Sequence, residues 1–384
     1  MNKKVAVILK NFEEAPENSD SFRGAVFYIL NFITSLSLIS EVDVFCETNK
    51  PLNENSRIKN IFNYSDENPL TTERLEEGGY DFVWNLTKNE LKKGNFITFT
   101  LQHSHSRIFR QKYIRRKYEL FIKKIFNPSR YYTKNRIEEY RKTFKQTDIL
   151  FANSKIAQED YVNLCGIKEE EVPVLNPMIK IPENISRKEH KVFTFGMSAL
   201  TFDLKGGYLF LEALHKLKKT NKNFRAKIIY PHFNKNFFLR FFVNFLELKE
   251  HVVFLDYQKN MNDFYGSVDC IVMPSREETF GFVAAEGMAH KLPVVVSNFS
   301  GICDIIEDNQ NGFIFDIRKN PVNNLCQALL KVLTAENLEQ IAQKAYETAQ
   351  NNSIEKHSRK LNMILDDFLK NKREQKDEHA QDTI

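Results

Sequence analysis

Two glutamates stand eight residues apart in a segment whose other residues predict one unit of a parallel sheet. Residues 271–296 have the sequence IVMPSREETFGFVAAEGMAHKLPVVV. The first apolar run predicts a buried strand that ends at Pro274, and a polar loop, an alanine-rich helix and a second apolar strand follow. Ligands of such sheets bind at the carboxyl ends of the strands, where helix N-termini favour anions. Glu278 on the loop and Glu286 on the helix are therefore expected to face one ligand, since carboxylates accept paired hydrogen bonds from sugar or ribose hydroxyls.

A lysine beside two glycines is the second group that could do chemistry. Lys205 precedes Gly206 and Gly207 where a helix through Leu217 is expected to begin. A cation at such a turn can neutralise a pyrophosphate while backbone N–H groups cradle it. We expect the loss of this charge to lower turnover more than stability, because the charge of a leaving group builds up in the transition state.

Two positions in the first half of the chain are weaker candidates for ligand contact. His103 follows an expected strand over residues 96–101, where a histidine can face a ligand or can simply be a hydrogen-bonded loop residue. His105 follows at a spacing that two metal ligands could have, but no carboxylate or thiol accompanies the pair in this segment, so we predict no metal site. Gly24 opens an expected helix after the strand 5–9, and it either binds phosphate or sugar or only connects the two elements.

Residues 107–145 form the most basic segment of the chain. They hold fourteen Lys and Arg against three Glu, a local charge of +11, whereas the whole chain carries +5, so the rest carries −6. Nine aromatic residues are interleaved with these charges. A charge run is usually a solvated face, but this composition favours contact with anionic lipid or an anionic acceptor. Arg115, Arg116 and Lys117 are the candidate contact residues. A nucleic-acid-binding protein is the alternative, although no known binding motif is present and the overall charge is modest.

Length and composition predict a globular chain of two domains. The chain has 384 residues, of which 42% are hydrophobic and 27% charged. Its five cysteines are dispersed without metal-like spacing, which is typical of reduced thiols in a cytosolic protein. The N-terminal apolar run is too short for a signal peptide, and no run reaches the roughly 18 apolar residues of a membrane span. We therefore expect a cytoplasmic protein that is soluble or peripheral on the inner face of the cytoplasmic membrane.

The alternation of strands and helices, which occurs twice, predicts two doubly wound α/β domains facing a cleft. The first domain is expected over residues 1–182 and the second over 190–352, with a helix at about 354–370 and a disordered charged tail at 371–384. A further helix is expected over residues 234–248. Its phenylalanines recur at helical spacing, which predicts a core face more often than a membrane contact; they are Phe237, Phe238, Phe241, Phe242 and Phe245.

The succession of residue types from Pro274 to Phe315 resembles the donor-site block of retaining glycosyltransferases of family 4, which have the GT-B fold. That block has a proline–serine pair, a glutamate, a phenylalanine–glycine pair and a second glutamate eight residues after the first. A proline–valine pair and a late asparagine–glycine pair follow. The matching residues are Glu278, Phe280, Gly281, Glu286, Pro293, Val294, Asn311 and Gly312.

The resemblance implies a hexosyl-transferring, retaining enzyme that moves a sugar from a nucleoside-diphosphate sugar to a glycan or lipid-linked acceptor in cell-surface polysaccharide or lipopolysaccharide synthesis. It implies that Glu286 binds the ribose, that Lys205 and Gly206 bind the pyrophosphate, and that Glu278 binds the donor sugar. It also implies a C-terminal helix that crosses back to the first domain, and catalysis without a metal or another cofactor. In the family, a donor phosphate oxygen takes the proton of the acceptor, so no protein base is named.

Backbone N–H groups of four loop residues are expected to help to bind the donor sugar: Thr279, Phe280, Gly281 and Phe282. His103 corresponds to a histidine that the family often carries near this sugar. The sequence also departs from the family pattern. Met197 stands where the family usually has a phosphate-binding arginine, a role for which Arg276 is the candidate replacement, and a single Gly24 stands where the family usually has paired glycines. A sugar-nucleotide epimerase with the same fold is an alternative, but that family lacks this glutamate block.

Overall fold

The computed structural model describes residues 3–9, 23–46, 60–65, 69–86, 94–101, 141, 144, 147–187 and 191–381. His103 and Arg115 to Lys117 lie outside these residues, as does nearly all of the basic segment 107–145.

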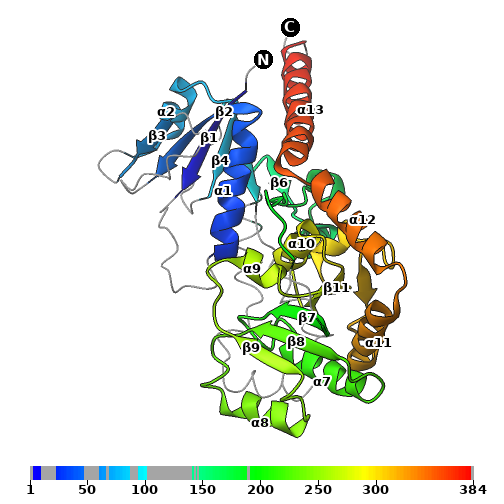
Figure 1. Ribbon diagram of the computed structural model, residues 1–384. Coiled ribbons are helices and arrows are strands. Elements are labelled where there is room, and N and C mark those ends of the chain that lie inside the picture. Colours follow the sequence, from blue (N-terminus) through cyan, green and yellow to red (C-terminus); the bar gives the residue numbers. More distant parts are fainter. Residues whose placement is uncertain are drawn as a thin grey trace.

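The first domain contains a six-stranded parallel sheet in the order β3-β2-β1-β4-β5-β6 (Figure 1). Its strands are β1 (Lys3–Leu9), β2 (Ser40–Cys46), β3 (Asn60–Asn63), β4 (Phe82–Asn85), β5 (Ile97–Leu101) and β6 (Ile149–Phe151). Its helices include α1 (Arg23–Ser37), α2 (Thr72–Glu77) and α6 (Lys155–Cys165). Most central-strand residues are buried on both faces, as expected for a parallel sheet covered by helices.

The second domain repeats this plan with a parallel sheet in the order β12-β11-β10-β7-β8-β9. Its strands are β7 (Phe193–Ser198), β8 (Phe224–Ile229), β9 (Val252–Leu255), β10 (Cys270–Met273), β11 (Val294–Ser297) and β12 (Phe313–Phe315). Its helices are α7 (Gly207–Lys218), α8 (Phe237–Phe245), α9 (Met261–Tyr265), α10 (Phe282–Ala289), α11 (Pro321–Thr334) and α12 (Leu338–Asn351). The prediction of two doubly wound α/β domains is confirmed.

In each sheet the chain reverses its direction of travel at one pair of neighbouring strands. From β7 it runs outward to β8 and β9, and it then returns to the other side of β7 with β10. Loops that leave the carboxyl ends of such a pair diverge to opposite sides of the sheet, and ligands of doubly wound folds bind at this switch point. The loops after β7 and β10 contain the candidate residues Lys205 and Glu278.

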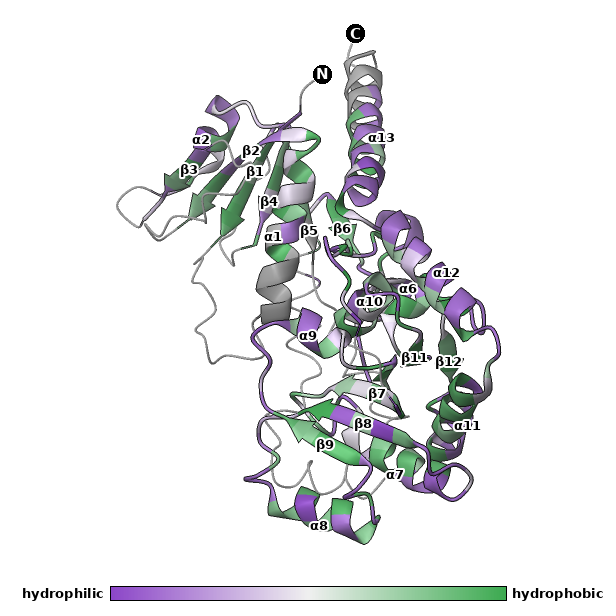
Figure 2. Cartoon of the chain, in the orientation of Figure 1, coloured by the Kyte–Doolittle hydropathy of each residue, from purple (hydrophilic) through white to green (hydrophobic). Residues whose placement is uncertain are grey.

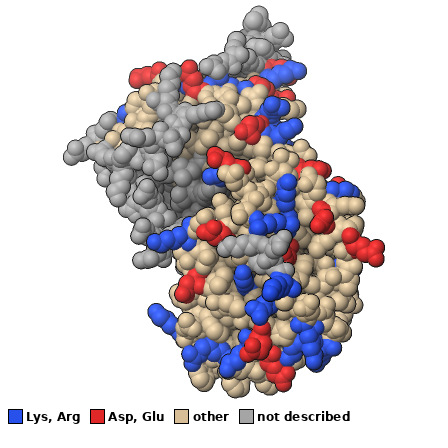
Figure 3. Space-filling model, in the orientation of Figure 1, with Lys and Arg blue, Asp and Glu red and all other residues tan. Residues whose placement is uncertain are grey.

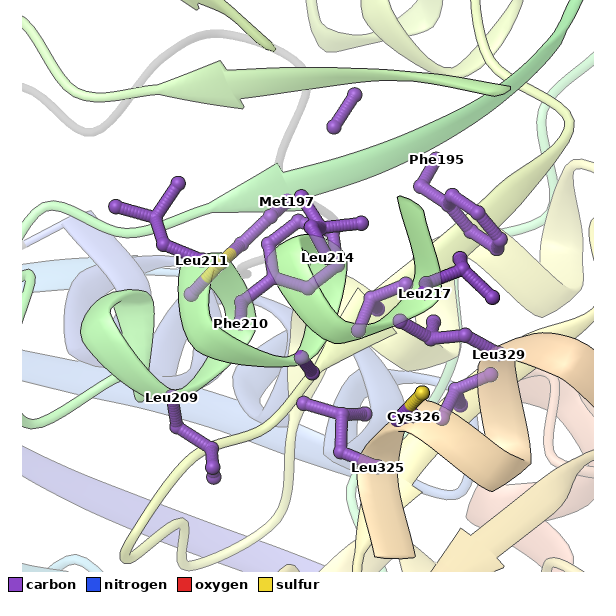
Figure 4. Packing of buried hydrophobic residues seen from close by; sticks show 14 of the residues in the cluster. Phe195, Met197, Leu209, Phe210, Leu211, Leu214, Leu217, Leu325, Cys326 and Leu329 are labelled. Atoms are coloured by element: carbon purple, nitrogen blue, oxygen red, sulfur yellow. The ribbon is translucent and has the colours of Figure 1, made fainter. Parts of the chain in front are cut away.

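Figure 4 shows part of the core of the second domain, where α7 and α11 pack beside the sheet. Met197 of β7 lies in this cluster with Phe210, Leu211 and Leu214 of α7, and it is only 1% exposed. Its side chain therefore serves packing. The position that corresponds to the family's phosphate-binding arginine contributes a core residue to this protein.

The last helix, α13 (Ile354–Gln381), returns to the first domain and packs against α1. Leu361 and Leu365 are fully buried in the core of the first domain, so the predicted crossing of the C-terminal helix is confirmed. A disordered tail is predicted from residue 371, and in the structure α13 continues as a helix to Gln381. Charged residues four apart, such as Lys370 and Glu374 at 3.8 Å, favour this continuation.

The prediction of a core face for the phenylalanines of α8 is wrong for four of the five. Leu239 and Val243 face the core, whereas the four phenylalanines on the opposite, outer face of α8 are each 62 to 79% exposed. This outer face consists of Phe237, Phe238, Phe241 and Phe245. The helix is apolar almost all round, so its sequence pattern does not distinguish the inner face from the outer one.

Within the described ranges, none of the helices combines the length and the apolar composition that a membrane span requires.

Candidate active site

The loops after β7 and β10 are joined to each other through their backbones. Arg276 donates its backbone N–H to the carbonyl of Leu204 over 3.0 Å. Gly206 has a φ of +79°, and a Cβ at this position would lie 2.0 Å from the carbonyl oxygen of Pro274. Only glycine fits a left-handed residue that approaches another backbone so closely. The glycine beside Lys205 is thus explained by the contact between the two loops.

Both helices that follow these loops begin at a glycine and have no side-chain cap. Gly206 precedes α7 and Gly281, with a φ of +118°, precedes α10. Some helices elsewhere in the protein have a side-chain cap, since Ser154 accepts the N–H of Ala157 in α6 and Asn260 accepts that of Asn262 in α9. The first N–H groups of a helix have no partner within the helix and attract anions. Both helices that begin at this switch point therefore present first-turn N–H groups that no side-chain oxygen caps.

Lys205 and Glu278 form an ion pair between the two loops. Their side chains are 33% and 17% exposed, so both can be reached from solvent. Glu278 is held by its backbone, which donates its N–H to Phe299 over 3.2 Å and accepts from Gly301 over 2.9 Å. The cation predicted to bind phosphate and the carboxylate predicted to bind a sugar are therefore neighbours. A ligand with phosphates and hydroxyls would offer each of them a new partner.

Arg276 is a second cation on these loops. Its Nη2 lies 3.6 Å from Oδ1 of Asp203, two residues before Lys205. Since Met197 lies in the core, Lys205 and Arg276 are the basic side chains that the described loops after β7 and β10 place at this site.

Glu286 lies one turn inside α10, where Tyr265 of α9 donates its hydroxyl to Oε2 of the carboxylate. Burial raises the pKa of Glu286 above its ordinary value, whereas the hydrogen bond from Tyr265 works in the opposite direction. Burial also raises the pKa of Tyr265 well above its ordinary value, and the neighbouring Glu286 adds to this shift. Tyr265 thus holds one oxygen of the carboxylate in place. It was not predicted, because nothing in its local sequence indicates this partner.

The first domain also fixes the loop that carries Glu278. Ser154, at the start of α6, donates its hydroxyl to the carbonyl of Thr279 over 2.7 Å. A Cβ on Gly301 would lie 2.0 Å from the same carbonyl oxygen and 2.6 Å from Ser154 Oγ. Phe282 at the start of α10 packs against the hydrophobic core of the first domain. These contacts join the two domains at the candidate site.

A second polar contact between the domains lies beside the first. Asp304 accepts the backbone N–H of Lys155 over 2.8 Å and the side-chain amide of Asn176 over 2.9 Å. Burial raises the pKa of the Asp304 carboxyl, and both hydrogen bonds oppose this shift. Neither Ser154 nor Asp304 was predicted as a site residue. Ser154 could have been recognised as a helix cap from its sequence position, but its contact with Thr279 could not.

The structure brings most of the predicted residues of the second domain together. Lys205, Gly206, Arg276 and the loop 278–282 meet at the switch point, and Glu286 lies one turn beyond that loop. Gly24 lies in the first turn of α1, in the first domain. His103 and the three basic candidates of the first domain are outside the described residues, so their roles stay predictions.

Comparison with known proteins relates the second domain to one family. Residues 179–352 match the family model for glycosyl transferases group 1. The chain is similar to the capsular polysaccharide biosynthesis glycosyltransferase CapM of Staphylococcus aureus, with 28% identity over 94 residues, 24% of this chain and 24% of that protein. The chain spans only 19 to 48% of the length of the first three curated relatives that it matches.

Solved structures resemble the chain over both domains. A glycosyltransferase from Rickettsia africae has a TM-score of 0.68 and 18% identity, and the likeness covers 96% of this chain and 99% of that one. Anabaena HepE in complex with UDP-glucose has a TM-score of 0.66 and 15% identity, and here 95% of this chain and 99% of that one are covered. At these identities the likeness shows a shared two-domain fold.

Proposed function

We propose that this protein is a glycosyltransferase, because residues 179–352 match the family model for glycosyl transferases group 1 and the whole chain has the GT-B fold. Its donor is a nucleoside-diphosphate sugar, and its acceptor is a glycan or a lipid-linked glycan of the cell surface. The anomeric configuration of the sugar is retained. The observation that carries this proposal is the Lys205–Glu278 pair, which joins the loops before two helices without side-chain caps at the switch point of the second sheet.

Each part of this site addresses one part of the chemical problem. The departing nucleoside diphosphate carries growing negative charge, which Lys205, Arg276 and the N-termini of α7 and α10 stabilise. Glu286, oriented by Tyr265, accepts hydrogen bonds from the ribose hydroxyls. Glu278 and the backbone of the loop 279–282 bind the donor sugar. The proton of the acceptor passes to a donor phosphate oxygen, so the proposal requires no protein base, metal or other cofactor.

The proposed function is tested with a panel of donors. Melting temperature is measured with UDP, GDP, ADP and their sugars, because a ligand that binds only the folded state raises it. Release of nucleoside diphosphate and transfer of sugar are then followed with the donor that binds. An epimerase would instead convert the donor into an isomer without loss of its sugar. Absence of binding by every nucleotide of the panel would contradict the proposal.

Replacement of Glu286 by alanine is expected to weaken nucleotide binding by about 1.5–3 kcal/mol, since hydrogen bonds to a charged group are lost. Calorimetric titration of parent and variant with the bound nucleotide measures this difference. Equal affinities would contradict the assignment of Glu286 to the ribose.

Two control variants separate the effect of the charge of Glu286 from the effect of its orientation by Tyr265. Glu286→Gln keeps an oxygen that accepts from Tyr265 but removes the charge, so its affinity should lie between those of the parent and the alanine variant. Tyr265→Phe leaves the carboxylate and removes only the hydroxyl that orients it. Its effect on affinity should be smaller than that of Glu286→Ala.

The basic segment 107–145 supports a further part of the proposal, namely that the acceptor is presented at an anionic membrane surface. Each basic residue near such a surface contributes about 1 kcal/mol, which salt screens within a Debye length. Changing Arg115, Arg116 and Lys117 together to glutamate is therefore expected to weaken binding to anionic vesicles by about 100-fold at low salt. Sedimentation with vesicles at low and high salt measures this change. Tight binding to nucleic acid without binding to vesicles would contradict it.

A further inference from the structure

The outer face of α8 is the largest group of exposed aromatic side chains among the described residues. Phe237, Phe238, Phe241 and Phe245 are each more than 60% exposed. Figure 2 shows α8 in green over most of its length, at the end of the second domain that lies farthest from the first domain. We propose that α8 is a membrane anchor, which inserts these four rings into the interfacial region of a lipid bilayer.

The outer face of α8 is not needed for the packing of the second domain. Leu239, Val243 and Leu246 already occupy the core of the second domain, and Phe242 packs against Tyr208 at a ring-centroid distance of 5.5 Å. The rings of the outer face pack on each other instead, with centroids 6.0 Å apart for Phe237 and Phe238 and 6.4 Å apart for Phe241 and Phe245. Contiguous exposed apolar surface of this kind marks an interaction site.

The patch formed by these four rings is small for a protein interface. A phenylalanine has roughly 200 Å² of accessible surface, so four rings at this exposure offer roughly 500–600 Å². A stable protein dimer usually requires about 800 Å² on each partner. The patch is therefore small for an interface between two copies of this chain. A bilayer sets no such requirement, since an interfacial helix inserts only its apolar face, to a depth of about 5–10 Å.

The charge along the same stretch is positive. Residues 232–246 contain Lys235 and Arg240 and no Asp or Glu, and both basic residues are exposed. Glu247, which follows, is paired with Lys218 at 2.9 Å. Long basic side chains beside an inserted face can extend to lipid headgroups. Figure 3 shows charges of both signs over this end of the molecule, so the attraction of α8 rests chiefly on its rings.

The inference is independent of the proposed activity, and it differs in physical character from the predicted contact of the basic segment. Contact through Arg115 to Lys117 is electrostatic and should vanish at high salt. Insertion of phenylalanine rings is driven by removal of apolar surface from water, so it persists at high salt and on uncharged lipid. The two contacts can therefore be measured separately on the same protein.

The test is sedimentation with vesicles of phosphatidylcholine at high salt. The parent is expected to bind, and the double variant Phe238→Ser with Phe241→Ser is expected to bind roughly 10- to 100-fold more weakly. Met363→Ser is the matched control, because Met363 is a single apolar side chain that is 67% exposed on α13. Since all three positions are exposed, these variants should keep the melting temperature of the parent. Equal binding of parent and double variant, or no binding of the parent, would overturn the inference.

A fluorescent variant tests insertion directly. The only tryptophan, Trp84, is fully buried in the first domain, so a tryptophan introduced as Phe238→Trp reports on the outer face of α8. Its emission should shift to shorter wavelength with phosphatidylcholine vesicles and stay unchanged without them. Sedimentation velocity without lipid tests the alternative that the outer face of α8 joins two copies of this chain. If the parent is a dimer and the double serine variant a monomer, the face joins two copies and the membrane inference is wrong.

Discussion

Replacing Lys205 by alanine is expected to lower the rate of sugar transfer by about 100- to 1,000-fold, the usual effect of removing one group that stabilises transition-state charge. Lys205 pairs with Glu278 in the free protein and would pair with the leaving phosphate during the reaction. Its contribution therefore grows as the bond to the sugar breaks, so kcat should fall more than the affinity for donor. Steady-state kinetics with saturating donor measures the change.

Two control variants test whether the charge of Lys205 itself is responsible for the loss of rate. Lys205→Arg keeps the charge but changes the geometry of the donors, so it should recover part of the rate. Arg276→Ala removes the neighbouring cation, which is already held by Asp203 at 3.6 Å, and a smaller loss is expected. The melting temperature of Lys205→Ala should stay close to that of the parent, since the pair is partly exposed. Turnover near the parental value in the folded variant would exclude Lys205 and leave Arg276 as the phosphate ligand.

Acid is expected to destabilise this protein through His357 of α13, which is buried and contacts α1 of the first domain. Its Nδ1 lies 2.7 Å from Ser35 Oγ of α1, and its Nε2 is buried without a partner. Burial, together with a smaller effect of the nearby Lys360 charge, lowers the pKa of His357 from 6.5 to about 3. The folded state thus keeps this imidazole neutral, whereas the unfolded chain takes up a proton as the pH falls below 6.5.

Because the unfolded chain binds a proton at His357 that the folded state does not bind, acid favours unfolding. Stability that is present above pH 6.5 is lost progressively as the pH falls toward about 3. At about 1.36 kcal/mol per pH unit, the loss reaches roughly 3 kcal/mol by about pH 4. His357→Gln cannot titrate and can still bond to Ser35, so its free energy of unfolding should fall less with acid by about this amount. Denaturant unfolding of parent and variant at several pH values measures the difference.

The exposed His232 provides the control for this experiment. His232→Gln removes a histidine without touching the α1–α13 contact, so it is measured beside His357→Gln. If His357→Gln and the parent lose the same stability between neutral pH and about pH 4, His357 is not the group that couples acid to unfolding. The α1–α13 contact would then have no part in the acid response.

The sequence by itself determined the local units of this protein. The run from Ile271 to Val296 contains its own strand, its own proline stop and its own helix formers, so β10, α10 and β11 follow from residues close together in the chain. The repeated alternation of such units predicted two doubly wound sheets, and in such sheets the carboxyl ends of strands bind ligands. The candidate residues Lys205, Glu278 and Glu286 could therefore be named without a structure.

Tertiary structure decided which of these residues are neighbours. Lys205 and Glu278 are 73 residues apart, Tyr265 and Glu286 are 21 apart, and Ser154 and Thr279 are 125 apart. Such pairs depend on how loops from different strands and domains meet, which short-range periodicity does not encode. The outer face of α8 is a second feature that the sequence pattern did not predict. A helix that is apolar on both sides gives no sign of which side the sheet will cover, so only packing decided that Leu239 and Val243 are buried while four phenylalanines face solvent.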